Sequence, residues 1–167
     1  MSLRGLYFEE MEIGAQFKHE LTRTVTEMDN VLFTSLTMNV APIHLDAEYT
    51  KTLPYGQRLV NSLYTAGLIG GMAVPGLVFG TSLGNLGYTL IEFPNPVFHG
   101  DTLRAETTIL DKRESKSDAT RGIVWFEHRG YNQRDQLVCL CRRTGMIMRS
   151  PADVATDLGV PHGGVPR

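Results

Sequence analysis

A short stretch of the chain, from Phe33 to Asp46, carries an amide, an imidazole and a carboxylate at Asn39, His44 and Asp46. His44 lies two residues after Pro42, where a loop can present its side chain to a cleft. Since an imidazole titrates near neutral pH, His44 is suited to proton transfer. Asn39 can orient water, but an amide takes up no proton at neutral pH. The segment therefore predicts acid–base chemistry centred on His44.

The sequence leaves two roles open for Asp46. A carboxylate beside an imidazole can fix its tautomer and raise its basicity, which would make Asp46 a catalytic partner of His44. An aspartate here can equally cap a short helix that runs through about Thr52. Both roles fit the residue type, so the choice depends on where the carboxylate points.

Helices and turns must position this segment. Thr26 and Asp29 have the form of a capping box, and the residues that follow predict a helix that ends near Asn39. Pro42 pushes the preceding residue out of the α region, so we expect residues 43–46 in an extended loop. The helical spacing rests on Met28, Val31, Leu32, Ser35 and Leu36.

The remainder of the chain predicts an α+β fold. Leu59 to Val74 is the most apolar segment and should form a central helix, in which Gly67, Gly70 and Gly71 let another backbone come close. Three long strands in a row suggest an antiparallel meander, and the order of elements favours a sheet wrapped around the helix. Strands are expected over residues 16–26, 88–93, 102–112, 121–132 and 137–148.

Composition limits the classes of partner. The 167 residues include 16 Lys+Arg and 18 Asp+Glu, and this net charge of −2 provides no field for nucleic acid or anionic lipid. The first residues lack a secretory signal and no segment suits a bilayer span, so we expect a soluble, cytoplasmic protein. Open sheet edges favour a homodimer or higher homo-oligomer. Cys139 and Cys141 are expected to be structural thiols, and no metal site is expected.

Three motifs follow one another along the chain. The first is the Leu36–Asp46 segment with Pro42, Ile43 and His44; the second is residues 58–63; the third is residues 93–103, with Pro-Val-x-x-Gly-Asp. Their order and spacing resemble the MaoC-like dehydratases and (R)-specific enoyl-CoA hydratases. The resemblance implies one hot-dog domain over residues 1–149, followed by a Pro/Gly-containing tail over residues 150–167.

The resemblance implies reversible addition of water to the double bond of an enoyl-CoA thioester. In this reading His44 activates the water and moves the proton. The family has an aspartate where this chain has Asn39. Either His44 works as the only acid and base with Asn39 as a positioner, or another carboxylate replaces the aspartate, with Asp46 the nearest in sequence.

The start of the central helix is the expected oxyanion site. Hydration builds negative charge on the thioester oxygen, and N–H groups at a helix N-terminus can hold it. Ser62 and Leu63 match the family position for this role. Asn61, which replaces a family histidine, either binds substrate or caps the helix. His99 either lines the entrance for substrate or CoA, or is a surface residue beside a turn.

The resemblance also suggests the acyl group. The context of Asn39 is similar to MaoC-like proteins tied to short branched dicarboxylyl-CoA substrates of the mesaconyl or itaconyl type. Such a substrate calls for a cation in the acyl pocket to meet its free carboxylate, and the sequence does not identify which arginine supplies it. Candidates for the CoA phosphates are Arg58, Arg104, Lys112, Arg113, Arg142 and Arg143.

Two other functions stay open. A hot-dog acyl-CoA thioesterase would need a carboxylate on or near the central helix, and Leu59 to Val74 has none. A catalytically degenerate acyl-CoA-binding subunit would follow if Asn39 abolished turnover. In each case the CoA thioester is the ligand, and neither a metal nor a redox cofactor is expected.

Overall fold

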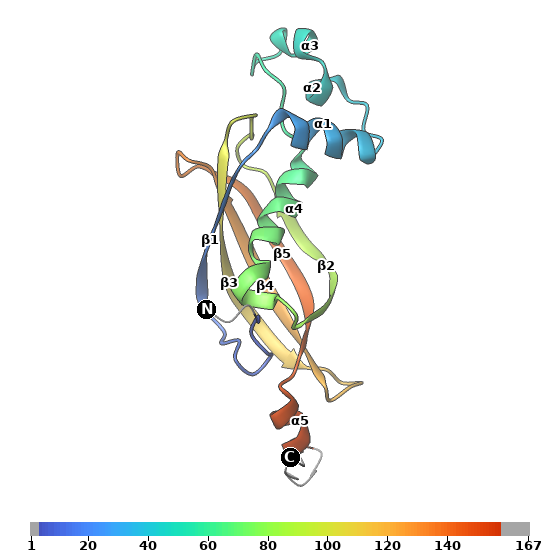
Figure 1. Cartoon of the computed structure of the whole chain (residues 1–167), viewed down its shortest axis with the longest axis vertical. Helices are drawn as coiled ribbons and strands as arrows, with labels where there is room; N and C mark the ends of the chain where they lie inside the picture. The colour runs from blue at the N-terminus through green and yellow to red at the C-terminus, as the bar shows by residue number, and fades with distance from the viewer. Residues whose placement is uncertain (1–3, 158–167) are drawn as a thin grey trace, which may run out of the picture.

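Five strands form one antiparallel sheet in the order β1-β3-β4-β5-β2 (Figure 1). The computed structural model describes residues 4–157. Strands β3, β4 and β5 are consecutive neighbours, which confirms the predicted meander. The strand bounds are β1 Gln16–Thr24, β2 Ser82–Glu92, β3 Thr102–Glu114, β4 Arg121–Tyr131 and β5 Leu137–Met148.

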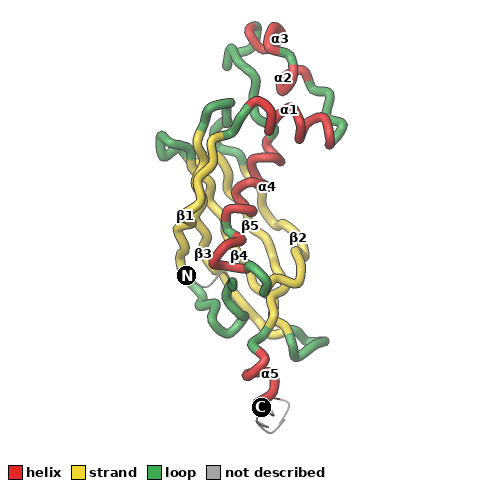
Figure 2. Tube along the Cα trace, in the orientation of Figure 1, coloured by secondary structure: helices red, strands yellow, loops and turns green. Residues whose placement is uncertain are grey.

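The central helix α4, Ser62–Met72, lies along the concave side of the curved sheet, as Figures 1 and 2 show. Its Ile69 is fully buried and packs so closely on β4 that a Cβ at Gly130 would come within 2.5 Å of the Ile69 side chain. The predicted close approach therefore occurs at a glycine of the sheet. The expectation that Gly67, Gly70 and Gly71 admit another backbone was wrong, because a Cβ at any of the three would meet nothing within 4 Å.

Helix α1, Glu27–Leu36, begins at the predicted capping box, where Thr26 accepts from the Asp29 backbone N–H and the Asp29 side chain accepts from Thr26. It ends three residues before the expected Asn39. Its buried residues are the polar Asn30 and Thr34, whereas its apolar stripe is exposed. The helix packs through hydrogen bonds and leaves an apolar face uncovered, at Met28, Leu32 and Leu36.

Residues 43–45 are helical, contrary to the predicted extended loop over residues 43–46. Pro42 starts a short helix, α2 Pro42–Leu45, and the extended residues are those on either side of it, Ala41 with φ −63° and ψ 122° and Asp46 with φ −103° and ψ 108°. The fixed φ of proline restricts the residue before it but suits the first position of a helix. A second short helix, α3 Ala47–Lys51, follows at once, and Figure 1 shows both at the end of the molecule beside α1.

The chain after α4 differs in two respects from the prediction. A turn over residues 74–78, bent where Pro75 (ψ 131°) and Gly76 (φ 76°) leave the helical region, leads into β2, and β2 starts at Ser82, six residues before the expected position. Register shifts near Gly84 and Gly87 bend β2 and interrupt the alternation that a strand normally shows. The expected turn near residues 153–158 is helix α5, Pro151–Asp157, while residues 158–167 of the predicted tail lie outside the described residues. None of the described helices is long and apolar enough to cross a membrane.

Candidate active site

His44 lies in α2, and one hydrogen bond fixes its ring. Its Nδ1 is 2.9 Å from the carbonyl oxygen of Leu59. Because a carbonyl oxygen only accepts, Nδ1 carries the proton, and Nε2 of the neutral ring is left with a free lone pair. The fold thus selects the tautomer and leaves Nε2 as the basic nitrogen.

A pocket of about 260 Å³ lies between His44 and the start of α4. Ser62 and Thr65 of α4 line it together with His44, and Val138 of β5 closes part of the apolar wall. The fold therefore brings together two of the residues predicted from the sequence, His44 and Ser62. A base and a helix N-terminus face one cavity, which suits proton transfer next to a developing negative charge.

The two predicted oxyanion donors, the backbone N–H groups of Ser62 and Leu63, differ in whether they are free. The side-chain oxygen of Asn61 accepts from the Leu63 backbone N–H at 3.1 Å, so the capping interpretation of Asn61 is confirmed. That bond occupies the Leu63 donor. Within residues 4–157, no acceptor is recorded for the Ser62 backbone N–H, which leaves it available at the N-terminus of the helix. The Ser62 N–H is the better placed of the two donors.

A fully buried asparagine, Asn30, connects the site to α1. Its Nδ2 lies 3.2 Å from the His44 carbonyl oxygen, 3.1 Å from that of Leu59 and 2.9 Å from Nε2 of His99. Its Oδ1 accepts from the Asn61 backbone N–H at 2.8 Å. The sequence analysis missed this residue, because an asparagine on the polar side of an amphipathic helix has the pattern of a solvated residue. No pattern in the sequence indicated that this polar side would be buried.

His99 lies next to Asn30 and does not line the pocket of His44. Burial lowers the pKa of His99 and the nearby Arg58 cation lowers it further, while Glu27 acts in the opposite direction. The ring is therefore neutral near pH 7, and its Nε2 accepts from the Asn30 amide. Arg58 forms an ion pair with Glu27 at 2.5 Å. A contact between His99 and substrate stays a prediction.

Asn39 and Asp46 shape the chain on either side of His44. The side-chain oxygen of Asn39 accepts from the Ala41 backbone N–H at 3.0 Å, a local turn that leads into α2. The exposed carboxylate of Asp46 accepts from two backbone N–H groups of α3 at 2.9 Å, so its capping interpretation is confirmed. Neither residue lines the pocket, and within the described part of the chain no hydrogen bond joins Asp46 to His44. The fold does not assemble the predicted Asp46–His44 pair, and a catalytic role for Asn39 or Asp46 stays a prediction.

Cys139 and Cys141 are buried free thiols in the core between α4 and the sheet. Burial raises the pKa of Cys139 to about 12, so this thiol stays protonated at neutral pH. Their interpretation as structural thiols is confirmed. No group of three or more His, Cys, Asp or Glu side chains is placed to hold a metal ion among residues 4–157.

Comparison with known sequences gives the family. The sequence matches the profile described as MaoC like domain over residues 9–127, which is most of the chain. The chain belongs to this family. Two of its curated relatives are a mesaconyl-CoA hydratase from Cereibacter sphaeroides, 29% identical over 95% of this chain, and a beta-methylmalyl-CoA dehydratase from Chloroflexus aurantiacus, 30% identical over 94%. The chain covers 50% and 44% of those two proteins, and so spans about half their length.

Solved structures confirm the hot-dog fold of this MaoC-like chain. A MaoC domain protein dehydratase from Chloroflexus aurantiacus has a TM-score of 0.82 and 27% identity, covering 99% of this chain and 46% of its own. A MaoC-like dehydratase from Rhodospirillum rubrum has a TM-score of 0.76 and 27% identity, and the match covers 88% of this chain and 99% of that protein. A Mycobacterium tuberculosis protein described as a double hot-dog fold, only 21% identical, has a TM-score of 0.77 and covers 88% of this chain and 45% of its own.

Proposed function

We propose that this protein adds water to the double bond of an enoyl-CoA thioester and, in reverse, dehydrates a 3-hydroxyacyl-CoA. One observation carries the proposal: Nε2 of His44 is free to act as a base, and its ring lines the same pocket as Ser62 at the start of α4. The names of the relatives, which are hydratases and dehydratases of CoA esters, support the same reaction.

The proposed reaction needs one base and one site for negative charge. Nε2 of His44 takes a proton from water as the oxygen bonds to C3 of the enoyl group. The π electrons move toward the thioester, whose oxygen becomes an enolate held by the Ser62 N–H at the positive end of α4. The protonated His44 then returns its proton to C2. Since only water is added, the step changes no oxidation state and needs no redox cofactor, and in this proposal the Ser62 N–H, rather than a metal ion, holds the negative charge.

In this proposal Asn39 and Asp46 are positioning residues that hold the backbone on either side of His44. Asn39 fixes the turn before α2, and its NH₂ group is left to orient water or substrate. Asp46 caps α3 directly after His44 and holds the end of α2 in place. His44 is then the only acid and base, which fits an asparagine in the place of the family aspartate.

The acyl group in our proposal is a short branched dicarboxylyl group of the mesaconyl or itaconyl type. Two of the relatives are named for mesaconyl-CoA and beta-methylmalyl-CoA, which both carry a free carboxylate. We place the reaction in the cytoplasm, where free thiols such as Cys139 and Cys141 stay reduced.

We further propose that a second copy of the chain covers β2, giving a homodimer or higher homo-oligomer. Strand β2 is at the edge of the sheet and exposes Leu83, Leu86 and Tyr88. An uncovered apolar edge strand readily pairs with another chain. Light scattering should give at least twice the mass of one chain for the wild type and a smaller mass for Leu86→Arg; a wild-type mass of one chain would contradict the proposal.

The reaction can be tested by mass spectrometry with crotonyl-, mesaconyl- and itaconyl-CoA. The wild type should add one water to at least one ester without release of free CoA. His44→Gln is the sharpest variant, because a glutamine amide can still donate to the Leu59 oxygen but has no basic nitrogen. We expect its kcat to fall by about 10²–10⁴-fold. Asn39→Asp, which restores the family residue, should retain or increase activity.

Each other outcome points to a different function. Release of free CoA would indicate a thioesterase. Binding of the esters without conversion, unchanged by His44→Gln, would indicate a degenerate binding subunit. Circular dichroism of the variants checks that a lost rate is not a lost fold.

A further inference from the structure

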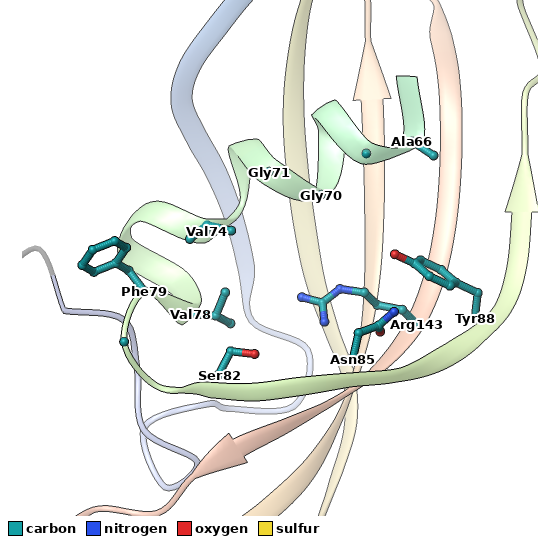
Figure 3. A pocket seen from close by; sticks show the side chains of 12 residues that line it. Ala66, Gly70, Gly71, Val74, Val78, Phe79, Ser82, Asn85, Tyr88 and Arg143 are labelled. Carbon is teal, nitrogen blue, oxygen red and sulfur yellow. The ribbon is translucent and has the colours of Figure 1, made fainter. Parts of the chain in front are cut away.

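A second pocket, of about 410 Å³, lies between the second half of α4 and strand β2 (Figure 3). It shares no lining residue with the pocket of His44. Its helix wall is mostly backbone, because Gly67, Gly70 and Gly71 have no side chains and an added Cβ at each would meet nothing within 4 Å. A water molecule takes up about 30 Å³ of the liquid, so the pocket has room for a small organic molecule and not only for one ion.

The lining of this pocket is apolar at one end and polar at the other. Both ends belong to the same space between α4 and β2, and Figure 3 shows their side chains turned toward it. A pocket with this division suits a ligand that has an apolar body and a polar head. The apolar end carries Val74, Val78 and Phe79, and the polar end carries Asn85, Tyr88 and Arg143.

The polar end contains a positive charge without a counter-charge from the described chain. Arg143 of β5 is partly buried, and no carboxylate forms an ion pair with it among residues 4–157. Its neighbour Arg142, by contrast, pairs with Glu127 at 2.8 Å. Burial lowers the pKa of Arg143, and Tyr88 acts in the opposite direction, but a guanidinium stays protonated at neutral pH in either case. An anionic ligand would supply the missing charge.

Buried residues of two other strands hold Arg143 in place. Its Nε donates to Nε2 of His128 at 2.8 Å, so that nitrogen carries no proton, and Nδ1 of the neutral ring donates to the Thr107 hydroxyl at 2.8 Å. Thr107 and His128 are each only 1% exposed, and burial lowers the pKa of His128 to about 3. The guanidinium carbon of Arg143 lies 4.6 Å from the ring centre of Phe126. These contacts use Nε and one face of the group, and the terminal N–H donors have no acceptor within the described part of the chain.

We propose that this pocket binds a free carboxylic acid, with its carboxylate on Arg143 and its apolar chain against Val78 and Phe79, at a site separate from the pocket of His44. A guanidinium matches a carboxylate with two parallel hydrogen bonds. The side chains of Asn85 and Tyr88 flank the same place and can donate further bonds (Figure 3). A single cation balances the one charge of a carboxylate, whereas a phosphate carries more negative charge and has no apolar chain.

This site is compatible with a second copy on β2. The pocket lies on the concave face of the sheet, between β2 and α4. Pairing of another chain would use the backbone groups along the outer edge of β2. A bound acid would connect α4 to β2 from the concave side, and its binding does not depend on the reaction proposed for His44.

Hexanoate and hexanamide test the charge, because they have the same chain and differ only in a carboxylate in place of a neutral amide. Calorimetry with the wild type should show tighter binding of hexanoate, by about 10-fold or more, the range for a hydrogen bond to a charged group. Inorganic phosphate should bind more weakly than hexanoate, because it leaves the apolar end of the pocket empty. Equal binding of hexanoate and hexanamide would overturn the proposal, and so would binding of phosphate as tight as that of hexanoate.

Arg143→Gln should lower the affinity for hexanoate by about 10–100-fold, toward that for hexanamide. Arg142→Gln is the matched control, because it removes an equal charge from the opposite face of β5 and leaves Glu127 paired with Arg129. Its affinity for hexanoate should equal that of the wild type. Equal loss in the two variants would mean that only the net charge matters, which would overturn the site.

Two further variants locate the ligand. Gly70→Leu fills the pocket from α4 and keeps the charge, so it should also abolish binding of hexanoate, and it keeps the test decisive if Arg143→Gln does not fold. Circular dichroism checks the fold of each variant. His44→Gln should bind hexanoate like the wild type, and loss of binding there would place the acid in the other pocket and overturn the proposal.

Discussion

Asn30 and His44 donate to the same acceptor, the carbonyl oxygen of Leu59, at 3.1 and 2.9 Å. The ring orientation of His44 therefore depends on the position of α1, which carries Asn30. Because Asn30 also accepts from the backbone of Asn61, one buried side chain sets the distance between the base and the N-terminus of α4.

Asn30→Leu should lower both stability and activity. The substitution leaves the buried Asn61 N–H without an acceptor and removes one of the donors to the Leu59 carbonyl oxygen. The free energy of unfolding should fall by about 2–4 kcal/mol. We expect urea unfolding to show this loss, and kcat to fall more than KM changes, because His44 loses its fixed position. Thr34→Val is the matched control: it removes a single 3.5 Å bond to Asn30 and should cost about 1 kcal/mol or less. Equal effects of the two variants would contradict the central role of Asn30.

Substitutions of Asn61 should separate capping from catalysis. Asn61→Ala removes the cap of α4 and should cost about 1 kcal/mol in urea unfolding. Asn61→Ser keeps a cap without charge and should preserve both stability and rate. Asn61→Asp keeps the cap but puts a negative charge beside the Ser62 N–H, where the reaction builds negative charge, so kcat should fall even if the protein stays folded. Full activity of Asn61→Asp would argue against an enolate at this end of α4.

Gly130→Ala should destabilise the contact between β4 and α4. The new Cβ would lie 2.5 Å from the Ile69 side chain, an overpacking that costs about 1–3 kcal/mol. In an Ile69→Ala background the same change should cost less, and a double-mutant cycle measures the difference. Gly67→Ala has open space and a helical position, so it should instead stabilise by up to about 1 kcal/mol. Additive effects of Gly130→Ala and Ile69→Ala would show that this contact does not limit the packing.

His128 should make the protein less stable as the pH falls below 6.5. Its folded pKa of about 3 lies below the unfolded value of 6.5, so the unfolded state binds the additional proton in this window. The contribution is complete above pH 6.5, and roughly 2 kcal/mol of it is lost by pH 5. Arg143 and His19 both face His128 and lower its pKa further. Urea unfolding at pH 7, 6 and 5 should show a shallower slope for His128→Gln than for the wild type; parallel slopes would mean that His128 does not titrate on unfolding.

Local patterns in the sequence were enough to predict much of the fold. The capping box at Thr26, the apolar segment of α4 and the three long strands each depend on neighbouring residues, and each occurs as an element in the structure. The capping roles of Asp46 and Asn61 belong to the same class, because a cap bonds to backbone only two or three residues away. The motif around His44 identified the family for a similar reason, since it is a run of residue types with fixed spacing.

Only the tertiary structure decided which side of each element is buried and what meets across it. The apolar spacing of α1 predicted a helix but did not reveal that the polar face, with Asn30, turns inward. The glycines of α4 are compatible with close packing of another backbone or with open space. In the structure they face open space, and together with β2 they line a pocket. Arg143 was one of six basic candidates until β5 placed it against that pocket. These outcomes depend on contacts between residues far apart in the chain, which neither local propensity nor motif spacing contains.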